Sequence, residues 1–180
     1  MLLAALLALC GPAPADSTEY ERLKRCALKG MPKCQMDLGV MYYTGEGARE
    51  DKAEAVRWFR KAAENGLPEA QHNLGLLLES GDGVEADPVE AVKWYAAAAE
   101  AGFAPAQINL ALMHGQGKGV PQNFAEAYTW CNIAAAFGSE NGPACRDLFA
   151  PRLSAEAIEK AQQRATERFE EIRSRTETKP

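Results

Sequence analysis

The sequence predicts an all-α protein, an α/α solenoid in which repeated helix-turn-helix units form a right-handed superhelix. Three observations lead to this fold class. The chain repeats itself every 36 residues, apolar residues recur within each unit at the period of an α-helix, and paired glycines separate the two helical stretches. A single helical hairpin cannot bury its apolar face alone, so repeated hairpins are expected to stack on one another.

The composition is that of an ordinary globular protein and excludes several classes of function. Of the 180 residues, 47% are hydrophobic and 25% are charged, and the net charge is −5. An acidic chain without clustered basic residues is a poor ligand for nucleic acid, since phosphate binding needs concentrated positive charge. No apolar run reaches the roughly 18 residues that a membrane-spanning helix requires. We therefore expect no nucleic-acid partner and no membrane span.

Residues 1–15 have the pattern of a cleaved secretory signal peptide. Met1 to Leu9 form an uninterrupted apolar run, and a small-residue segment of the A-x-A type ends at Ala15. We expect cleavage after Ala15 and a mature chain that is periplasmic or secreted. The absence of Lys or Arg before the apolar run leaves the start codon open, and an uncleaved hydrophobic N-terminus is the alternative. A lipid anchor at Cys10 is disfavoured, because Leu9 stands where lipidated signals carry a small residue.

The 36-residue period is visible at many positions. All three tryptophans of the protein, Trp58, Trp94 and Trp130, occupy one position of the repeat. Such a register is not expected by chance, and it fixes the alignment of the three units. The other repeated positions hold Leu38, Leu74 and Leu110; Gly45, Gly81 and Gly117; Gly47, Gly83 and Gly119; Ala55, Ala91 and Ala127; Ala62, Ala98 and Ala134; and Gly66, Gly102 and Gly138.

Each unit reads as a hairpin of two helices. The first helix ends at a turn with two glycines, which reach backbone conformations that other residues avoid. A glycine or alanine within this helix leaves a flat spot where a neighbouring helix can approach closely. The second helix begins at Asp51, Asp87 or Asn123, and a Glu three positions later predicts a reciprocal capping box in every unit. The flat spots are at Gly39, Gly75 and Ala111.

The run A-x-x-x-L-G-x-x-Y-x-x-G-x-G-[VA]-x-x-D-x-x-x-A-x-x-W-x-x-x-A-A-x-x-G, within Cys34 to Gly138, resembles the Sel-one-like repeat, a relative of the tetratricopeptide repeat. The resemblance implies a solenoid that presents surfaces to partner proteins, and it says almost nothing about activity. We expect no cofactor and no enzymatic activity. We expect a monomer with an N-terminal half repeat at 16–34, three repeats at 35–142, C-terminal capping helices at 143–175 and a disordered tail at 176–180.

Four cysteines follow the signal peptide, and they lie symmetrically about turn glycines. Cys26 and Cys34 are each four residues from one such glycine, and Cys131 and Cys145 are each seven residues from another. Residues equidistant from a helical turn face each other, so both pairs are within approximate reach of a disulfide. The first spacing is also similar to that of secreted cysteine-rich members of the family, which implies a bond between adjoining helices. The alternative is that all four are small buried hydrophobic residues.

Similarity to tetratricopeptide arrays implies a concave groove lined by the first helix of each unit. Side chains on these helices that point away from the packing face are candidates for peptide binding, with asparagine amides for the backbone and an apolar row beside them. Contact with neighbouring helices is the alternative role for each of them. The candidates are Met36, Asp37, Val40 and Tyr43 in the first unit, His72, Asn73, Leu76 and Glu79 in the second, and Ile108, Asn109 and Leu112 in the third.

Motifs that could carry chemistry are better explained by the repeat. Gly81 to Ala86 matches a dinucleotide-binding fingerprint, but it joins two helices rather than a strand and a helix. His72 and His114 have no Cys, Asp or Glu at metal-ligand spacing, so we expect no metal site. No serine is followed three residues later by lysine, the arrangement of serine enzymes that act on β-lactams.

The sequence and the resemblance together predict an exported adaptor that binds a protein or peptide, with regulation of an envelope receptor as one role. The alternative function comes from the resemblance alone. Some cysteine-rich members of the family are described as binding or hydrolysing β-lactams, which leaves a hydrolase or a binder of cell-wall fragments as the competing class.

Overall fold

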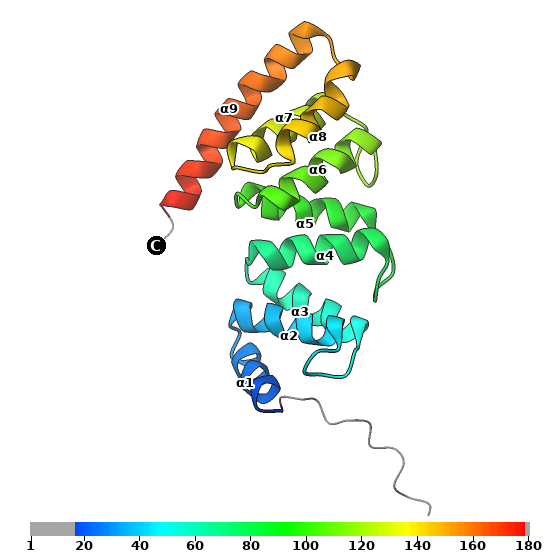
Figure 1. Cartoon of the computed structure of the whole chain (residues 1–180), viewed down its shortest axis with the longest axis vertical. Coiled ribbons are helices and arrows are strands. Elements are labelled where there is room, and N and C mark those ends of the chain that lie inside the picture. Colours follow the sequence, from blue (N-terminus) through cyan, green and yellow to red (C-terminus); the bar gives the residue numbers. More distant parts are fainter. Residues whose placement is uncertain (1–16, 179–180) are drawn as a thin grey trace, which may run out of the picture.

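The computed structural model describes residues 17–178, and within this range the regular structure is entirely helical. The helices follow one another along an elongated stack (Figure 1), which confirms the predicted α-solenoid. The predicted signal peptide lies outside the described residues, as do the last two residues of the predicted tail. The helices are α1 (Ser17–Leu28), α2 (Pro32–Thr44), α3 (Lys52–Glu64), α4 (Pro68–Ser80), α5 (Pro88–Glu100), α6 (Ala104–Gln116), α7 (Phe124–Ala136), α8 (Gly142–Phe149), the 3-10 helix η1 (Ala150–Arg152) and α9 (Ala155–Glu177).

Three helical hairpins form the middle of the stack. The pairs α2 and α3, α4 and α5, and α6 and α7 are packed against each other, and each hairpin contacts the next through α3 on α4 and α5 on α6. One continuous core of buried apolar side chains runs from α3 to α9. A second, smaller cluster of Ala27, Leu38 and Trp58 closes the N-terminal end. The second helix of one unit therefore packs on the first helix of the following unit, as expected.

Each hairpin turn begins with a glycine in the left-handed conformation. Gly45 has a φ of 75°, and its N–H donates to the carbonyl of Met41 in the last turn of α2. An L-amino acid with a side chain rarely adopts this φ, so the glycine is the residue that lets the chain leave the helix. Gly81 and Gly117 end α4 and α6 in the same way.

The expected capping boxes are half right. The side chain of Asp51 accepts a hydrogen bond from the backbone N–H of Glu54 at 2.9 Å, and the N-caps of α5 and α7 make the same bond. The expected return bond, from the Asp51 N–H to the Glu54 carboxylate, is wrong, because this N–H donates instead to the carbonyl of Tyr42 at 2.8 Å. This donor satisfies a carbonyl near the end of α2 and ties the two helices together, which leaves the Glu side chain available for other partners. The bond recurs from Asp87 to Leu78 and from Asn123 to His114.

The flat spots on the first helices receive aromatic rings from the second helices. Gly75 lies under Tyr95, and a Cβ atom at position 75 would come within 2.6 Å of the ring carbon Cε1. In the third hairpin, Ala111 takes the place of the glycine and Cys131 takes the place of the aromatic residue. The two positions therefore complement each other in size within each hairpin. The equivalent pairs are Gly39 with Phe59 and Ala111 with Cys131.

A buried glutamine joins each hairpin to the helix before it. Gln71 donates from Nε2 to the carbonyl of Ala63 at 3.1 Å, across the junction of α3 and α4. Gln35 and Gln107 make the same bond to carbonyls of α1 and α5. The Oε1 of Gln35 also accepts a hydrogen bond from Asn65 Nδ2 at 2.9 Å. The Oε1 atoms of the other two glutamines are buried without a hydrogen-bond partner among residues 17–178.

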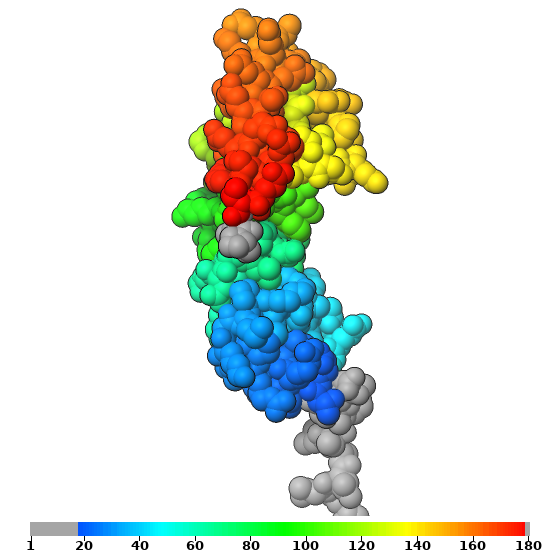
Figure 2. All heavy atoms as spheres, turned by 90° about the vertical axis from the view of Figure 1, so that its left-hand side faces the viewer, coloured from blue at the N-terminus to red at the C-terminus, as the bar shows by residue number. Residues whose placement is uncertain are grey.

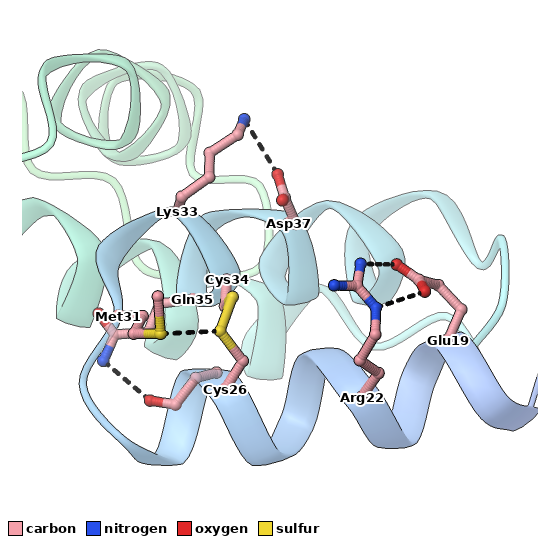
Figure 3. Close-up of a disulfide and its surroundings, with 9 residues drawn as sticks. Glu19, Arg22, Cys26, Met31, Lys33, Cys34, Gln35 and Asp37 are labelled. Carbon is pink, nitrogen blue, oxygen red and sulfur yellow. Dashed lines mark hydrogen bonds and ion pairs between the residues drawn. A yellow bond between two sulfur atoms is a disulfide. The ribbon is translucent and has the colours of Figure 1, made fainter.

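Both expected cysteine pairs are confirmed. Cys26 and Cys34 form a disulfide between α1 and α2, with their Cα atoms 5.7 Å apart (Figure 3). Cys131 and Cys145 form a second one between α7 and α8, with a Cα–Cα distance of 5.5 Å. The first pair is half-buried and the second is buried in the core. Covalent bonds therefore hold both ends of the helical stack.

The C-terminal helices close the stack. Ser154 caps α9 by accepting a hydrogen bond from the N–H of Ala157, and α9 packs across α7. In the space-filling view, α9 lies on the outside of the molecule and its C-terminal end reaches the level of α5 (Figure 2). The predicted disorder from residue 176 is wrong for Thr176 and Glu177, which belong to α9. An ion pair between Arg175 and Glu100, at 2.8 Å, anchors this end of the helix to α5.

We predict that Gly75→Ala destabilises the protein by about 1–3 kcal/mol, because the new methyl group collides with the buried Tyr95 ring. Urea denaturation followed by circular dichroism measures the change. In a Tyr95→Ala background the same substitution should instead stabilise the protein by roughly 1 kcal/mol, since alanine is the better helix former. An equal cost in both backgrounds would contradict the steric explanation.

We predict that Ala101→Asn stabilises the protein by about 1 kcal/mol. Position 101 follows Asn65 by 36 residues, and the two backbones have nearly the same conformation, with φ and ψ of −86° and 6° against −80° and 9°. The new amide can donate to the partnerless Oε1 of Gln71, as Asn65 does to Gln35. Urea denaturation tests this, with Ala101→Ser as the control because its hydroxyl is too short. An Asn variant no more stable than the Ser variant would disprove the prediction.

Candidate protein-binding surface

The eleven side chains predicted to bind a partner lie on α2, α4 and α6, and they differ in their exposure to solvent. Val40 and Leu76, one repeat apart, are 40% and 41% exposed, and Tyr43 is 37% exposed. Leu112 holds the equivalent position in the third hairpin, where it is half-buried and packs against the core. This repeat position is therefore exposed in the first two hairpins and partly covered in the third.

Two of the predicted residues tie one hairpin to the next. The hydroxyl of Tyr43 donates to Asp82, in the turn of the following hairpin, at 3.0 Å. Glu79 is the equivalent of Tyr43, and it pairs with Lys118 in the next turn at 2.9 Å. Glu79 also accepts a hydrogen bond from the hydroxyl of Tyr95 at 2.8 Å. Glu79 is thus held by its own chain, whereas the ring of Tyr43 stays accessible.

The partners in these ties were missed by sequence reasoning. Asp82 also pairs with Lys52 at 3.0 Å, and this ion pair lowers the pKa of the Asp82 carboxyl. The lysine ammonium lies 5.4 Å from the centre of the Tyr43 ring. The sequence did contain a signal for these interactions. Tyr43 and Glu79 are 36 residues apart, and so are Asp82 and Lys118, so the two interacting pairs occupy the same repeat positions. Comparing residue pairs at equivalent positions of successive units would have suggested the contact between hairpins.

His72 and Asn109 contact each other rather than an open surface. The Nε2 of His72 is 3.0 Å from the Nδ2 of Asn109, and its ring packs at 5.3 Å from Phe103 and 5.9 Å from Tyr95, centre to centre. Burial lowers the pKa of His72, so its imidazole is neutral at neutral pH and can accept the amide hydrogen. These side chains therefore join α4 to α6.

The remaining predicted residues divide into packed and accessible ones. Met36 and Ile108 are half-buried against the core, and Asp37 forms an ion pair with Lys33 at 3.1 Å. Asn73 is half-buried on α4. The most exposed residues of the predicted set are thus Val40, Tyr43 and Leu76, which we call the apolar row.

A different set of charged side chains gathers where α9 crosses α5 and α7. Arg168 bonds to Glu126 at 3.0 Å and also to Glu100, and its guanidinium stacks 4.2 Å from the centre of the Trp130 ring. Burial raises the pKa of Glu100, but the ion pairs with Arg168 and Arg175 outweigh it and leave that pKa lowered. This network fixes α9, and the hollow of about 320 Å³ beside it is lined by Glu100, Arg164, Glu167, Arg168 and Glu171.

A second hollow lies on α5. Its volume is about 430 Å³, and Trp94 forms its apolar wall while Nε1 of that ring donates to Glu90 at 3.0 Å. Asp87, Lys93 and Ala97 complete the lining. Neither this hollow nor the one beside α9 is lined by any of the eleven predicted residues. The predicted surface is a set of side chains on exposed helix faces rather than an enclosed pocket.

The described residues provide no ready-made metal centre. Across residues 17–178, no group of three or more His, Cys, Asp or Glu side chains is placed to hold a metal ion. His114 is half-buried, burial lowers its pKa, and its Nδ1 has no hydrogen-bond partner within that range. None of the helices in the described part of the chain combines the length and apolar composition needed to cross a bilayer.

This architecture is similar to that of several known proteins. The chain is 44% identical over 62 residues to the secretory immunoglobulin A-binding protein EsiB of Escherichia coli, an alignment covering 34% of this chain and 13% of EsiB. The solved structure of c5321, a protective antigen of uropathogenic Escherichia coli with an SLR fold, superposes with a TM-score of 0.79 and 30% identity. That match covers 89% of this chain and 36% of c5321. The chain thus spans about an eighth of EsiB and about a third of c5321.

Two shorter solved structures match along nearly their whole length. A Sel1 repeat protein from Oxalobacter formigenes has a TM-score of 0.66 at 38% identity, with 71% of this chain and 96% of that one covered. The cysteine-rich protein B of Helicobacter pylori has a TM-score of 0.56 at 22% identity, over 72% and 98% of the two chains, and shows the common fold. The Sel1 repeat family model matches residues 32–67, 68–103 and 104–138, each of which contains one of the three central hairpins. This chain therefore belongs to the Sel1 repeat family.

Proposed function

We propose that the protein is an exported scaffold that binds another polypeptide through the apolar row of α2 and α4. The observation that carries the proposal is the exposure of Val40, Tyr43 and Leu76 on the first helices of successive hairpins, while His72, Glu79 and Asn109 of the predicted set bond within the fold. An exposed apolar patch is typical of a binding site, and Val40 and Leu76 occupy the same repeat position on the first helices of successive hairpins. The scaffold is a Sel1 repeat solenoid, and the relative EsiB is named for binding secretory immunoglobulin A.

Rigidity of the array supports this role. Polar ties such as Tyr43 to Asp82 and Glu79 to Lys118 join successive hairpins beside the row. A surface held in its binding conformation loses little conformational entropy when a partner docks. The disulfides near both ends of the array add to this preorganisation.

Export is the second part of the proposal. Two disulfides are compatible with an oxidising compartment and uncommon in the cytosol. The sequence also begins with an apolar run, Met1 to Leu9, followed by small residues up to Ala15. A partner would then be an envelope or extracellular polypeptide, and we propose a receptor of the cell envelope as its class. The network around Arg168 has a structural role in this proposal and no catalytic one.

Site-specific photocrosslinking in intact cells tests the proposal. A benzoylphenylalanine at position 76 should give a discrete crosslinked polypeptide, whereas one at Lys93, an exposed site on α5, should not. Adding Val40→Asp should lower the yield about tenfold, because a carboxylate buried against an apolar partner costs on the order of 1–2 kcal/mol.

Two results would overturn this function. One is an equal pattern of adducts from positions 76 and 93, or a yield that Val40→Asp leaves unchanged while circular dichroism shows an intact fold. The other is turnover of a chromogenic β-lactam by the pure protein that Leu76→Asp abolishes, which would support the alternative hydrolase instead.

A further inference from the structure

Three sulfur atoms meet at the turn between α1 and α2. Cys26 lies in the last turn of α1, Cys34 lies in the first turn of α2, and Met31 is the residue that precedes α2. The Sδ atom of Met31 lies 3.3 Å from the Sγ atom of Cys26, beside the disulfide (Figure 3). A thioether that touches a cysteine pair provides a third soft donor atom once the pair is reduced.

The geometry of this turn does not depend on the disulfide. The N–H of Gly30 donates to the carbonyl of Ala27 at 3.0 Å, and Gln35 Nε2 bonds to the same carbonyl at 3.2 Å. Equivalent bonds close the turns before α4 and α6, where alanines occupy both cysteine positions. The repeat itself therefore holds these positions together, and the two sulfurs stay close after reduction. The alanines are Ala62 and Ala70 in one turn and Ala98 and Ala106 in the next.

The site is also open to solvent, unlike its equivalents within the array. The alanines at the cysteine positions of later turns are fully buried, because a preceding hairpin covers them. No helix of the described chain precedes α1, so Cys26 and Cys34 are half-buried and Met31 is 53% exposed. The second disulfide contrasts with the first, since Cys131 and Cys145 are both buried. A small ion can therefore reach the first cysteine pair without unfolding the protein.

We propose that Cys26, Cys34 and Met31 form a binding site for a soft monovalent metal ion, Cu(I), when the disulfide between α1 and α2 is reduced. Thiolate and thioether sulfurs select Cu(I) over Mg²⁺ or Ca²⁺, which prefer oxygen. Three sulfur donors match the low coordination number of this ion better than the four-coordinate preference of Zn²⁺. The ion would then join α1 to α2 in place of the covalent bond.

The reaction balances with a dithiol reductant. A dithiol gives two electrons and two protons to the disulfide, becomes a disulfide itself, and leaves two free thiols at positions 26 and 34. Cu(I) then displaces the two thiol protons to solvent and keeps its oxidation state. The complex carries one net negative charge, and Cys34 lies in the first turn of α2, where the helix dipole favours negative charge.

Competition with a chelator tests the site on the purified protein. We expect the phosphine-reduced protein, without oxygen, to take one equivalent of Cu(I) from bathocuproine disulfonate, and the oxidised protein to take none. Met31→Leu should weaken the affinity by at least about tenfold, the loss typical even of groups outside the first coordination shell. Leucine is a conservative choice because the chain itself carries Leu67 at the equivalent position.

Matched variants separate this site from the second cysteine pair. Cys26→Ser with Cys34→Ser should abolish binding and retain Cys131 and Cys145 as an internal control. Cu(I) should also slow hydrogen exchange in α1 of the reduced wild-type protein, which incidental binding by loose thiols would not do. Failure of the reduced protein to compete, equal affinity of the Met31→Leu variant, or binding that survives the double serine variant would each overturn the proposal.

Discussion

Close contact between small residues on neighbouring helices is the constraint on which the rest of the molecule depends. Ala55, Ala91 and Ala127 are completely buried at one repeat position, and Ala62, Ala98 and Ala134 at another. Methyl groups at these sites allow the backbones to approach, and a lone hairpin would leave the same faces in water. The glutamine bonds between hairpins exist only at this separation, so the polar connections of the array follow from its apolar packing.

The three tryptophans occupy one position of the repeat, but their surroundings differ. Trp130 is buried beneath Arg168 of α9, Trp94 is half-exposed and bonded to Glu90, and Trp58 belongs to the N-terminal cluster with Lys61 over its ring. The repeat places the three rings equivalently, but the ends of the array decide what covers them. Position along the stack, rather than residue identity, thus determines which of these rings meet solvent.

Much of the fold was predictable because its determinants are local and repeated. The left-handed Gly45, the N-cap Asp51 and the pairing of Cys26 with Cys34 all follow from residues close together in sequence. The return bond of the capping box was wrong because the Asp51 N–H finds a carbonyl of the preceding helix, a contact that depends on how the helices meet. The internal partners of the candidate surface were missed for the same reason. His72 and Glu79 look available on one helix, and only the stacking of hairpins brings Asn109 and Lys118 to them.

The path of α9 limits how arrays of this kind can change in length. Its arginines bond to Glu100 of the second hairpin and Glu126 of the third, so the helix recognises the last two units together. A duplicated unit inserted after residue 138 would supply its own glutamate at the position of Glu126, because Glu54, Glu90 and Glu126 are equivalent. It would also place Ala136 where Glu100 now stands, so Arg168 and Arg175 would lose that carboxylate. A unit gained upstream of α5 would leave this docking intact. We therefore expect added units to preserve the docking of α9 when they lie on the N-terminal side of the array, and to weaken it when they separate α9 from the hairpin that carries Glu100.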